Sequence, residues 1–135
     1  MNRQSPIIIA ITAKEERDKL SELNRKIMGS DKDPFYGAPV VLVVLADKTI
    51  PTYIYDGSLV MENLMLAAYD LGLGSCWIHR AKEEFEMPEG KALLAKLGIH
   101  GNYEGIGHCI LGYTEGIYPE PSPRKEGRVY YIEKG

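Results

Sequence analysis

The segment from Leu59 to Leu71 most constrains how this chain can fold. A helix over these residues would be apolar on nearly every side, so it has to be buried in a protein core or in a subunit interface. Its polar residues (Glu62, Asn63 and Asp70) and its short length make it unsuited to crossing a bilayer. The apolar residues that produce the pattern are Leu59, Val60, Met61, Leu64, Met65, Leu66, Ala67, Ala68 and Leu71.

The ends of this helix are also marked in the sequence. Asp56 can cap its start, and Gly72 and Gly74 can end it because glycine adopts the left-handed backbone conformation without a Cβ clash. The residues Cys76 to Ile78 then predict a short buried strand. The sequence therefore predicts a buried helix followed directly by a strand of the core.

Composition and charge limit the size and the partners of the protein. With 135 residues, 44% apolar and 26% charged, we expect a single domain over residues 1–135. The net charge of −3 is spread over the chain, which argues against binding to duplex nucleic acid or to an anionic membrane. The N-terminus does not resemble a secretory leader, and two distant cysteines are not a disulfide framework, so we expect a cytoplasmic protein.

The first half of the chain predicts helices on both sides of a sheet. Pro6 to Ile11 and Val40 to Ala46 are continuous apolar runs, which is typical of strands buried on both faces. Between them, Thr12 and Glu15 have the spacing of a capping box for an amphipathic helix that ends near Gly29.

The second half predicts shorter elements and an extended tail. Pro88 can open a short helix that stops at Gly98. Gly105 to Tyr113 predicts a strand whose glycines indicate a bulge or a close backbone contact. The proline-rich segment 114–127 should be extended, and Arg128 to Glu133 predicts a last edge strand.

Two motifs could indicate a bound dinucleotide or a bound zinc ion, but the order and spacing of their residues argue against both. The pair Gly72 and Gly74 follows a helix, whereas a dinucleotide fingerprint needs glycines before a helix, so a helix end is the better interpretation. Cys76 and His79 have a C-x-x-H spacing and could join His108–Cys109 around zinc. Adjacent residues on a strand point to opposite faces, so we expect no metal site, and no partner motif supports either cysteine as a nucleophile.

Polar residues near the two ends of the chain are better candidates for binding. Asn2 and Gln4 offer the amides that suit the edge of a heterocycle, and Arg3 suits an anion. The alternative is a disordered terminus. Arg124 and Lys125 could meet a phosphate or could simply be solvated. The acidic residues Glu83, Glu84 and Glu86 are interpreted as the solvated face of a surface turn.

Taken in order, several segments resemble the FMN-dependent nitroreductase family over nearly the whole chain. The segments are N-x-Q before the first strand, FYGAPVVLVVLAD, D-x-S-x-x-x-x-N-L-M-L-A-A, LGLGSCWI, GHCILGY and a P-R-K tail. The resemblance implies an α+β fold with a mixed central sheet between helices. It also implies that the apolar helix packs in a homodimer, with FMN bound at the dimer interface.

The same resemblance implies a function and a set of binding residues. The function is that of an oxidoreductase in which FMN passes hydride from NAD(P)H to a small aromatic acceptor such as a nitroaromatic or a quinone. Asn2 and Gln4 match amides that contact the flavin ring, with Arg3 between them. The remaining matches are Trp77, Ile78, His79 and Arg80, which line the isoalloxazine, and Arg124 and Lys125, which lie near the phosphate.

The chain departs from the family pattern at its start. Family members normally carry a preceding helix opened by R-R-S-x-R, whose basic side chains bind the FMN phosphate, and this motif is absent here. Either the start of the chain is misassigned, or the chain is an N-terminally truncated form that has lost part of its cofactor site. In both cases we expect this chain to bind FMN weakly. The alternatives are a flavin-free or flavin-poor dimeric scaffold or binding protein derived from the family, and a protein of flavin storage or breakdown.

Overall fold

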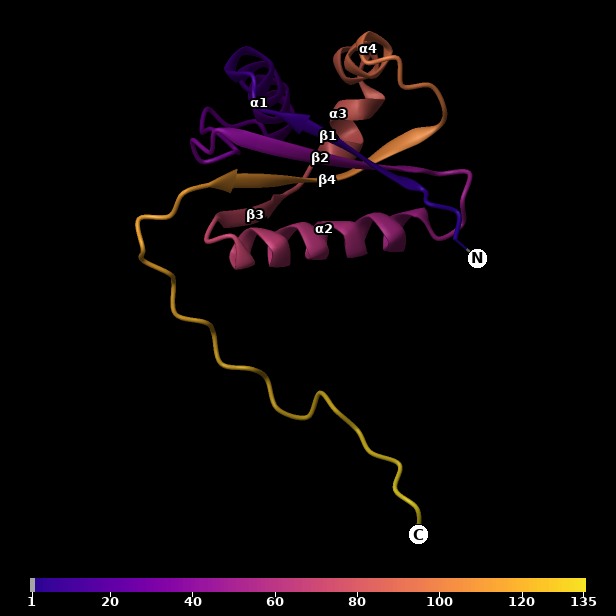
Figure 1. Cartoon of the computed structure of the whole chain (residues 1–135), viewed down its shortest axis with the longest axis vertical. Coiled ribbons are helices and arrows are strands. Elements are labelled where there is room, and N and C mark those ends of the chain that lie inside the picture. Colours follow the sequence, from indigo (N-terminus) through magenta and orange to yellow (C-terminus); the bar gives the residue numbers. More distant parts are fainter. Residues whose placement is uncertain (1) are drawn as a thin grey trace.

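A sheet of four strands, in the spatial order β1-β2-β4-β3, organises the protein (Figure 1). The computed structural model describes residues 2–135. The strands are β1 (Pro6–Ile11), β2 (Val40–Asp47), β4 (Tyr103–Gly112) and β3 (Gly74–Ile78). The predicted α+β class is confirmed, but the three strand pairings among the described residues are all antiparallel, so the sheet is not mixed.

Helices cover both faces of this sheet, as predicted. One face carries α2 (Tyr53–Asp70), and the other carries α1 (Lys14–Met28), α3 (Ala81–Glu86) and α4 (Pro88–Lys96) (Figure 1). No helix within residues 2–135 has the length and apolar character needed to cross a membrane.

The central strand β2 confirms the prediction of burial on both faces, whereas β1 does not. Val43 and Val44 are both fully buried and belong to separate apolar clusters on opposite faces of the sheet. In β1, Ile9 and Ile11 are buried, but Ile8 is 47% exposed and Ala10 is exposed as well. Because β1 is an edge strand and α2 packs mainly against β2, β4 and β3, the outer side of β1 lacks a covering helix.

Glycines allow the helices to approach the sheet closely. A Cβ atom at Gly105 would lie 2.2 Å from the carbonyl oxygen of Ala81, so α3 packs directly on the backbone of β4. The pairing of β2 with β4 shifts register between Val44 and Leu45, which confirms the irregularity predicted from the glycines of this strand.

The helix ends follow the predictions only in part. Gly29 after α1 and Gly72 after α2 are left-handed, with φ 67° and 73°, and Pro88 opens α4 as predicted. The predicted capping box of Thr12 and Glu15 is not present, because Ala13 is the N-cap of α1 and no side chain caps it. The prediction that Asp56 caps the following helix was also wrong, because α2 begins earlier, at Tyr53.

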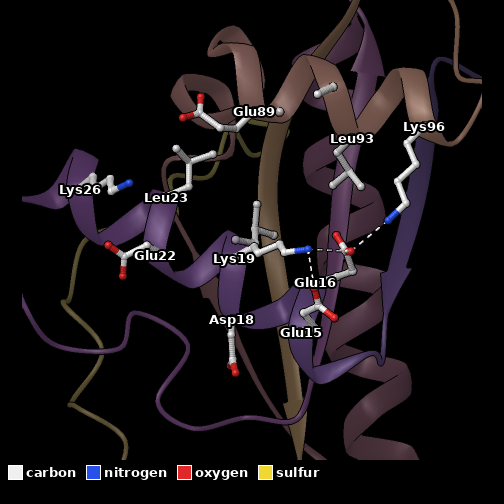
Figure 2. Close-up of a pocket in the computed structure, with 13 residues that line it drawn as sticks. Glu15, Glu16, Asp18, Lys19, Glu22, Leu23, Lys26, Glu89, Leu93 and Lys96 are labelled. Atoms are coloured by element: carbon white, nitrogen blue, oxygen red, sulfur yellow. Dashed lines mark hydrogen bonds and ion pairs between the residues drawn. The ribbon is translucent and has the colours of Figure 1, made fainter.

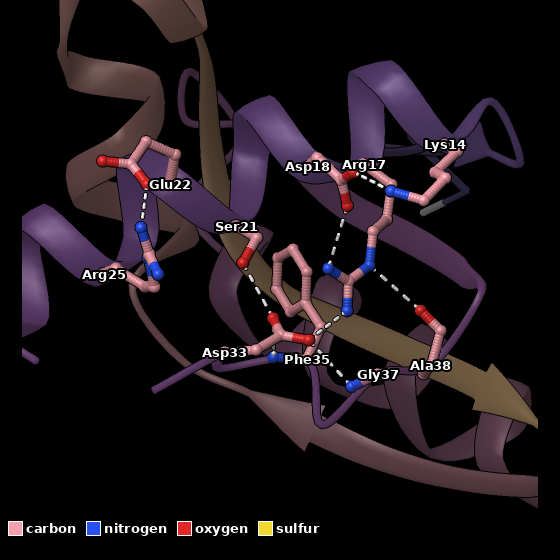
Figure 3. A network of polar contacts seen from close by, with 10 residues as sticks. All are labelled: Lys14, Arg17, Asp18, Ser21, Glu22, Arg25, Asp33, Phe35, Gly37 and Ala38. Carbon is pink, nitrogen blue, oxygen red and sulfur yellow. Dashed lines mark hydrogen bonds and ion pairs between the residues drawn. The ribbon is translucent and has the colours of Figure 1, made fainter. Parts of the chain in front are cut away.

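Partly buried polar contacts hold the loop 30–39 against α1 (Figure 3). The Arg17 guanidinium pairs with Asp33, lies 5.4 Å from the centre of the Phe35 ring and donates through Nε to the Ala38 carbonyl oxygen at 3.1 Å. Ser21 Oγ donates to Asp33 Oδ1 at 2.7 Å. These contacts hold the fully buried side chain of Phe35 in the core.

The residues after β4 form an extended tail that leads away from the sheet (Figure 1). Segment 114–127 contains no helix or strand, as predicted. The edge strand predicted for Arg128 to Glu133 was wrong, and Tyr130 and Ile132 are 87% and 104% exposed. A strand needs a neighbouring sheet edge for its hydrogen bonds, and within one chain the tail has none beside it.

The Asp33 contacts predict how stability depends on pH. Burial by itself would raise the pKa of Asp33, but hydrogen bonds from Arg17, Ser21 and the backbone N–H groups of Gly37 and Phe35 outweigh it and hold that pKa below 3.8. A carboxyl with a lowered folded-state pKa stabilises the protein above its unfolded-state pKa and loses this contribution as the pH falls. We expect Asp33→Asn to lower the free energy of unfolding at neutral pH, with the difference from wild type shrinking below about pH 4.

Urea unfolding at neutral, mildly acidic and strongly acidic pH measures this difference. Asp31→Asn is the control, because Asp31 is an exposed aspartate of the same loop and should contribute little. If the difference in the free energy of unfolding between wild type and Asp33→Asn stays constant with pH, the lowered pKa of Asp33 is contradicted.

Candidate functional site

A pocket of about 580 Å³ lies between the N-terminal segment and the first turns of α2. It brings together three of the predicted site residues, Asn2, Arg3 and Gln4, and its volume is in the range of small-molecule sites. Its other lining residues, which the sequence did not reveal as a site, are Ser5, Pro6, Ile50, Pro51, Thr52, Asp56 and Val60.

Two hydroxyl groups fix the carboxylate of Asp56 at this pocket. The buried Ser5 donates through Oγ to Asp56 Oδ2 at 2.6 Å, and Thr52 Oγ1 donates to the same oxygen at 3.0 Å. Gln4, beside Ser5, has φ 47°, a left-handed conformation that costs a residue with a Cβ roughly 1–2 kcal/mol. The bond between Ser5 and Asp56 therefore helps to hold a strained segment against α2.

The predicted residues Trp77 to Arg80 lie elsewhere, where β3 ends and α3 begins. Strands β1 and β3 are opposite edges of the sheet, which places them roughly 14 Å apart at the usual strand spacing. His79 is exposed, Ile78 is buried in the core, and Arg80 is left-handed with φ 79°. One chain therefore does not bring these four residues into the pocket of Asn2.

The predicted basic residues Arg124 and Lys125 are both exposed and lie in the extended tail. Neither lines the pocket that contains Asn2, Arg3 and Gln4. Their assignment to a phosphate stays a prediction.

A buried polar cluster, formed by Asn24, Glu84 and His108, lies beneath the turn after β3. All three side chains are fully buried, so the interpretation of Glu84 as a solvated residue was wrong, whereas Glu83 and Glu86 are exposed as predicted. Glu84 shares the buried face of α3 with Ala81 and Phe85. This spacing of three and four residues is the pattern in the sequence that could have revealed it.

The bonds within this cluster are directional. His108 Nδ1 lies 3.2 Å from the carbonyl oxygen of Ile78, which can only accept, so Nδ1 carries a hydrogen. His108 Nε2 lies 2.6 Å from Glu84 Oε2. Asn24 Nδ2 donates both to Glu84 Oε1 and to the carbonyl oxygen of His79, the latter at 2.9 Å. The cluster thus binds two successive carbonyl groups of the turn.

His108 and Cys109 point to opposite faces of the sheet, as expected for neighbours on a strand. His108 packs 5.3 Å from Phe35 between ring centres, while Cys109 packs with Val44 and Met61 under α2. Burial raises the pKa of Cys109 to about 11, so its thiol stays protonated. Among residues 2–135 no three acidic, histidine or cysteine side chains gather as metal ligands, and the expected absence of zinc stays a prediction.

A larger cleft of about 710 Å³ separates α1 from α4 (Figure 2). Its floor is apolar, with Leu23 and Leu93, and its rim carries exposed ion pairs from Lys19 and Lys96 to Glu16 at 3.3 and 3.0 Å. Hydrogen bonds from these lysines hold the pKa of Glu16 below its ordinary value. Exposed pairs of this kind are common surface features, and none of the predicted site residues lines the cleft.

The fold agrees with the family indicated by the residue motifs. The chain belongs to the nitroreductase family, whose model matches residues 1–113.

Known proteins support this assignment at the level of sequence and of fold. A protein of Archaeoglobus fulgidus with the provisional name NADH dehydrogenase/NAD(P)H nitroreductase is 37% identical over 83 residues, which are 58% of this chain and 46% of that protein. The chain thus spans about half the length of this curated relative.

Solved structures also support membership of the nitroreductase family. A Bacteroides fragilis nitroreductase with bound FMN superposes with a TM-score of 0.85 at 25% identity, over 98% of this chain and 79% of the other. A nitroreductase family protein of Clostridium difficile gives a TM-score of 0.63 at 29% identity, over 95% and 70%. The nitroreductase fold expected from the sequence is confirmed.

The contact between Ser5 and Asp56 predicts a measurable effect on stability. We expect Ser5→Ala to lower the free energy of unfolding by about 1–3 kcal/mol, because it removes the hydrogen bond of a buried hydroxyl group to a partly buried carboxylate. Thr52→Ala is the matched control, since Thr52 is exposed and water can replace its bond to the same carboxylate oxygen. Chemical unfolding of both variants measures the difference, and equal losses would contradict the role given to Ser5.

Proposed function

We propose that this protein is an FMN-dependent oxidoreductase that transfers hydride from NAD(P)H to small aromatic acceptors, of which nitroaromatics and quinones are examples. The observation that supports it best is the pocket lined by Asn2, Arg3 and Gln4 in a chain of the nitroreductase family.

The residues of this pocket fit the chemistry of FMN. The amides of Asn2 and Gln4 both donate and accept hydrogen bonds, as the polar edge of a flavin ring requires. The guanidinium of Arg3 suits an anionic group, and Ile50 and Val60 offer apolar surface to an aromatic ring.

Bound FMN would supply the redox chemistry between the nicotinamide donor and the acceptor. The chain would supply binding and orientation. Asn2 and Gln4 would fix the orientation of the ring, and Asp56, whose carboxylate is held by two hydroxyl groups, would fix the N-terminal segment. We assign no catalytic acid or base to the pocket.

A second copy of the chain would complete the site. In one chain Trp77 to Arg80 lie at the edge of the sheet opposite to the pocket, so we propose that these residues serve the pocket of a partner subunit in a homodimer. The exposed side of α2 supports this, because Leu59 and Leu66 are 67% and 57% exposed although the helix is apolar. One isolated chain leaves this side of the helix open. A second copy would cover it, and burial in a subunit interface, one of the two locations predicted for this helix, stays a prediction.

The proposed dimer predicts the effect of a charge on α2. We expect wild type to be a dimer at micromolar concentration and Leu66→Lys to be a monomer, because a lysine would be desolvated in the interface. Leu97→Lys is the control, since Leu97 is a 50% exposed leucine that follows α4 on the other face of the sheet. Light scattering during gel filtration measures both, and a monomeric wild type would remove the proposal.

The proposed cofactor predicts a binding measurement. We expect added FMN to bind the wild-type protein, and Asn2→Ala or Gln4→Ala to weaken binding by about tenfold each, the effect of one lost hydrogen bond. Asn102→Ala is the control, because Asn102 is an exposed amide outside the pocket. Flavin fluorescence during titration gives the affinity, and oxidation of NADH or NADPH by the loaded protein gives the activity.

Each result of this experiment has a definite meaning. FMN binding with NAD(P)H oxidation supports the oxidoreductase. Binding without oxidation would favour a flavin-binding or storage protein, and no binding at all would favour the flavin-free scaffold.

A further inference from the structure

The turn from Ile78 to Arg80 is held from inside the protein by side chains of two other elements. His108 on β4 donates to the carbonyl oxygen of Ile78, and Asn24 on α1 donates to that of His79. Glu84 on α3 joins the two donors, because its two carboxylate oxygens bind one each. Two successive carbonyl groups of a short turn are therefore anchored at separate points.

Keeping such a cluster in a core has a cost. Three polar side chains are fully buried, and Asn24 Oδ1 has no hydrogen-bond partner. Apolar residues of similar volume are often at least as stabilising as a buried charged or polar group. The cluster is thus better explained by the conformation that it imposes than by the stability that it adds.

That conformation determines where two backbone donors point. In a trans peptide the N–H group points opposite to the carbonyl of the same peptide unit, and the chain has no cis peptide bonds among its described residues. Because the carbonyls of Ile78 and His79 point inward to the cluster, the N–H groups of His79 and Arg80 point away from it. The left-handed backbone of Arg80, with φ 79°, follows directly and leads into α3.

We propose that Asn24, Glu84 and His108 are positioning residues that fix the two N–H groups of this turn toward the cofactor, and so set its affinity and its reduction potential. This rests on the function proposed above. Fixed N–H groups stabilise negative charge that develops on a bound group without having to reorient. A loosened turn would therefore bind FMN more weakly and make its reduction harder.

Three variants separate positioning from stability. Asn24→Ala removes the donor to the carbonyl of His79. Glu84→Gln is the conservative variant, because glutamine can keep a bond to each of the other two residues and leaves both anchored carbonyls. Ser21→Ala is the matched control, since Ser21 is a buried polar residue of the same helix that loses one hydrogen bond without touching the turn.

The experiment measures amide hydrogen exchange of residues 79–81 without flavin, the dissociation constant for FMN, and the midpoint potential of the bound FMN. For Asn24→Ala we expect exchange at residues 79–81 to accelerate at least tenfold, FMN affinity to fall about tenfold, and the potential to become more negative. Glu84→Gln should stay close to wild type in exchange rate, FMN affinity and midpoint potential. Ser21→Ala should lower the free energy of unfolding and leave these three quantities unchanged.

The outcomes distinguish this inference from the proposed function. If exchange at residues 79–81 in Asn24→Ala matches wild type, or Ser21→Ala shows the same changes, the positioning role is wrong. If wild type binds no FMN, the proposed function fails, and hydrogen exchange still decides whether the cluster fixes the turn. Faster exchange with an unchanged affinity and potential would overturn the link to the cofactor.

Discussion

The rest of the structure depends on the burial of β2 on both of its faces. Val43 faces the layer of α1, α3 and α4, and Val44 faces α2, and neither is accessible to solvent. A strand of this kind needs a strand on each side for its backbone groups and a helix on each face for its side chains. These requirements place β1 and β4 beside it, and they place the first turns of α2 near the start of β1, where the candidate pocket forms.

Features determined by neighbouring residues could be predicted from the sequence. The end of α1 at Gly29, the start of α4 at Pro88 and the irregularity near Gly105 follow from local backbone chemistry, and all three are present. The edge position of β1 could not be predicted, because an apolar run has the same appearance whether or not a helix covers both of its faces. The strand expected for Arg128 to Glu133 failed for a related reason, since a pattern of residues does not reveal whether a partner edge is available.

The candidate site could also be predicted from the sequence only in part. The amides of Asn2 and Gln4 stood out as binding residues because they precede a core strand directly. Their neighbours Thr52 and Asp56 come from a distant segment, so only the fold reveals that they share a pocket. Glu84 was misread for an electrostatic reason: a carboxylate among other acids is usually solvated, and its burial here depends on partners from β4 and α1.

The order of the strands has a consequence for synthesis on the ribosome. The partner of β2 on one side, β1, precedes it in the chain, but its other neighbour, β4, begins only at Tyr103. Until then one edge of β2 has unpaired backbone groups, and closing the long intervening segment carries an entropic cost before any contact is gained. A nascent chain that pauses before Tyr103 therefore exposes its most apolar strand along an open edge, which is the state in which newly made β-proteins associate wrongly or recruit chaperones.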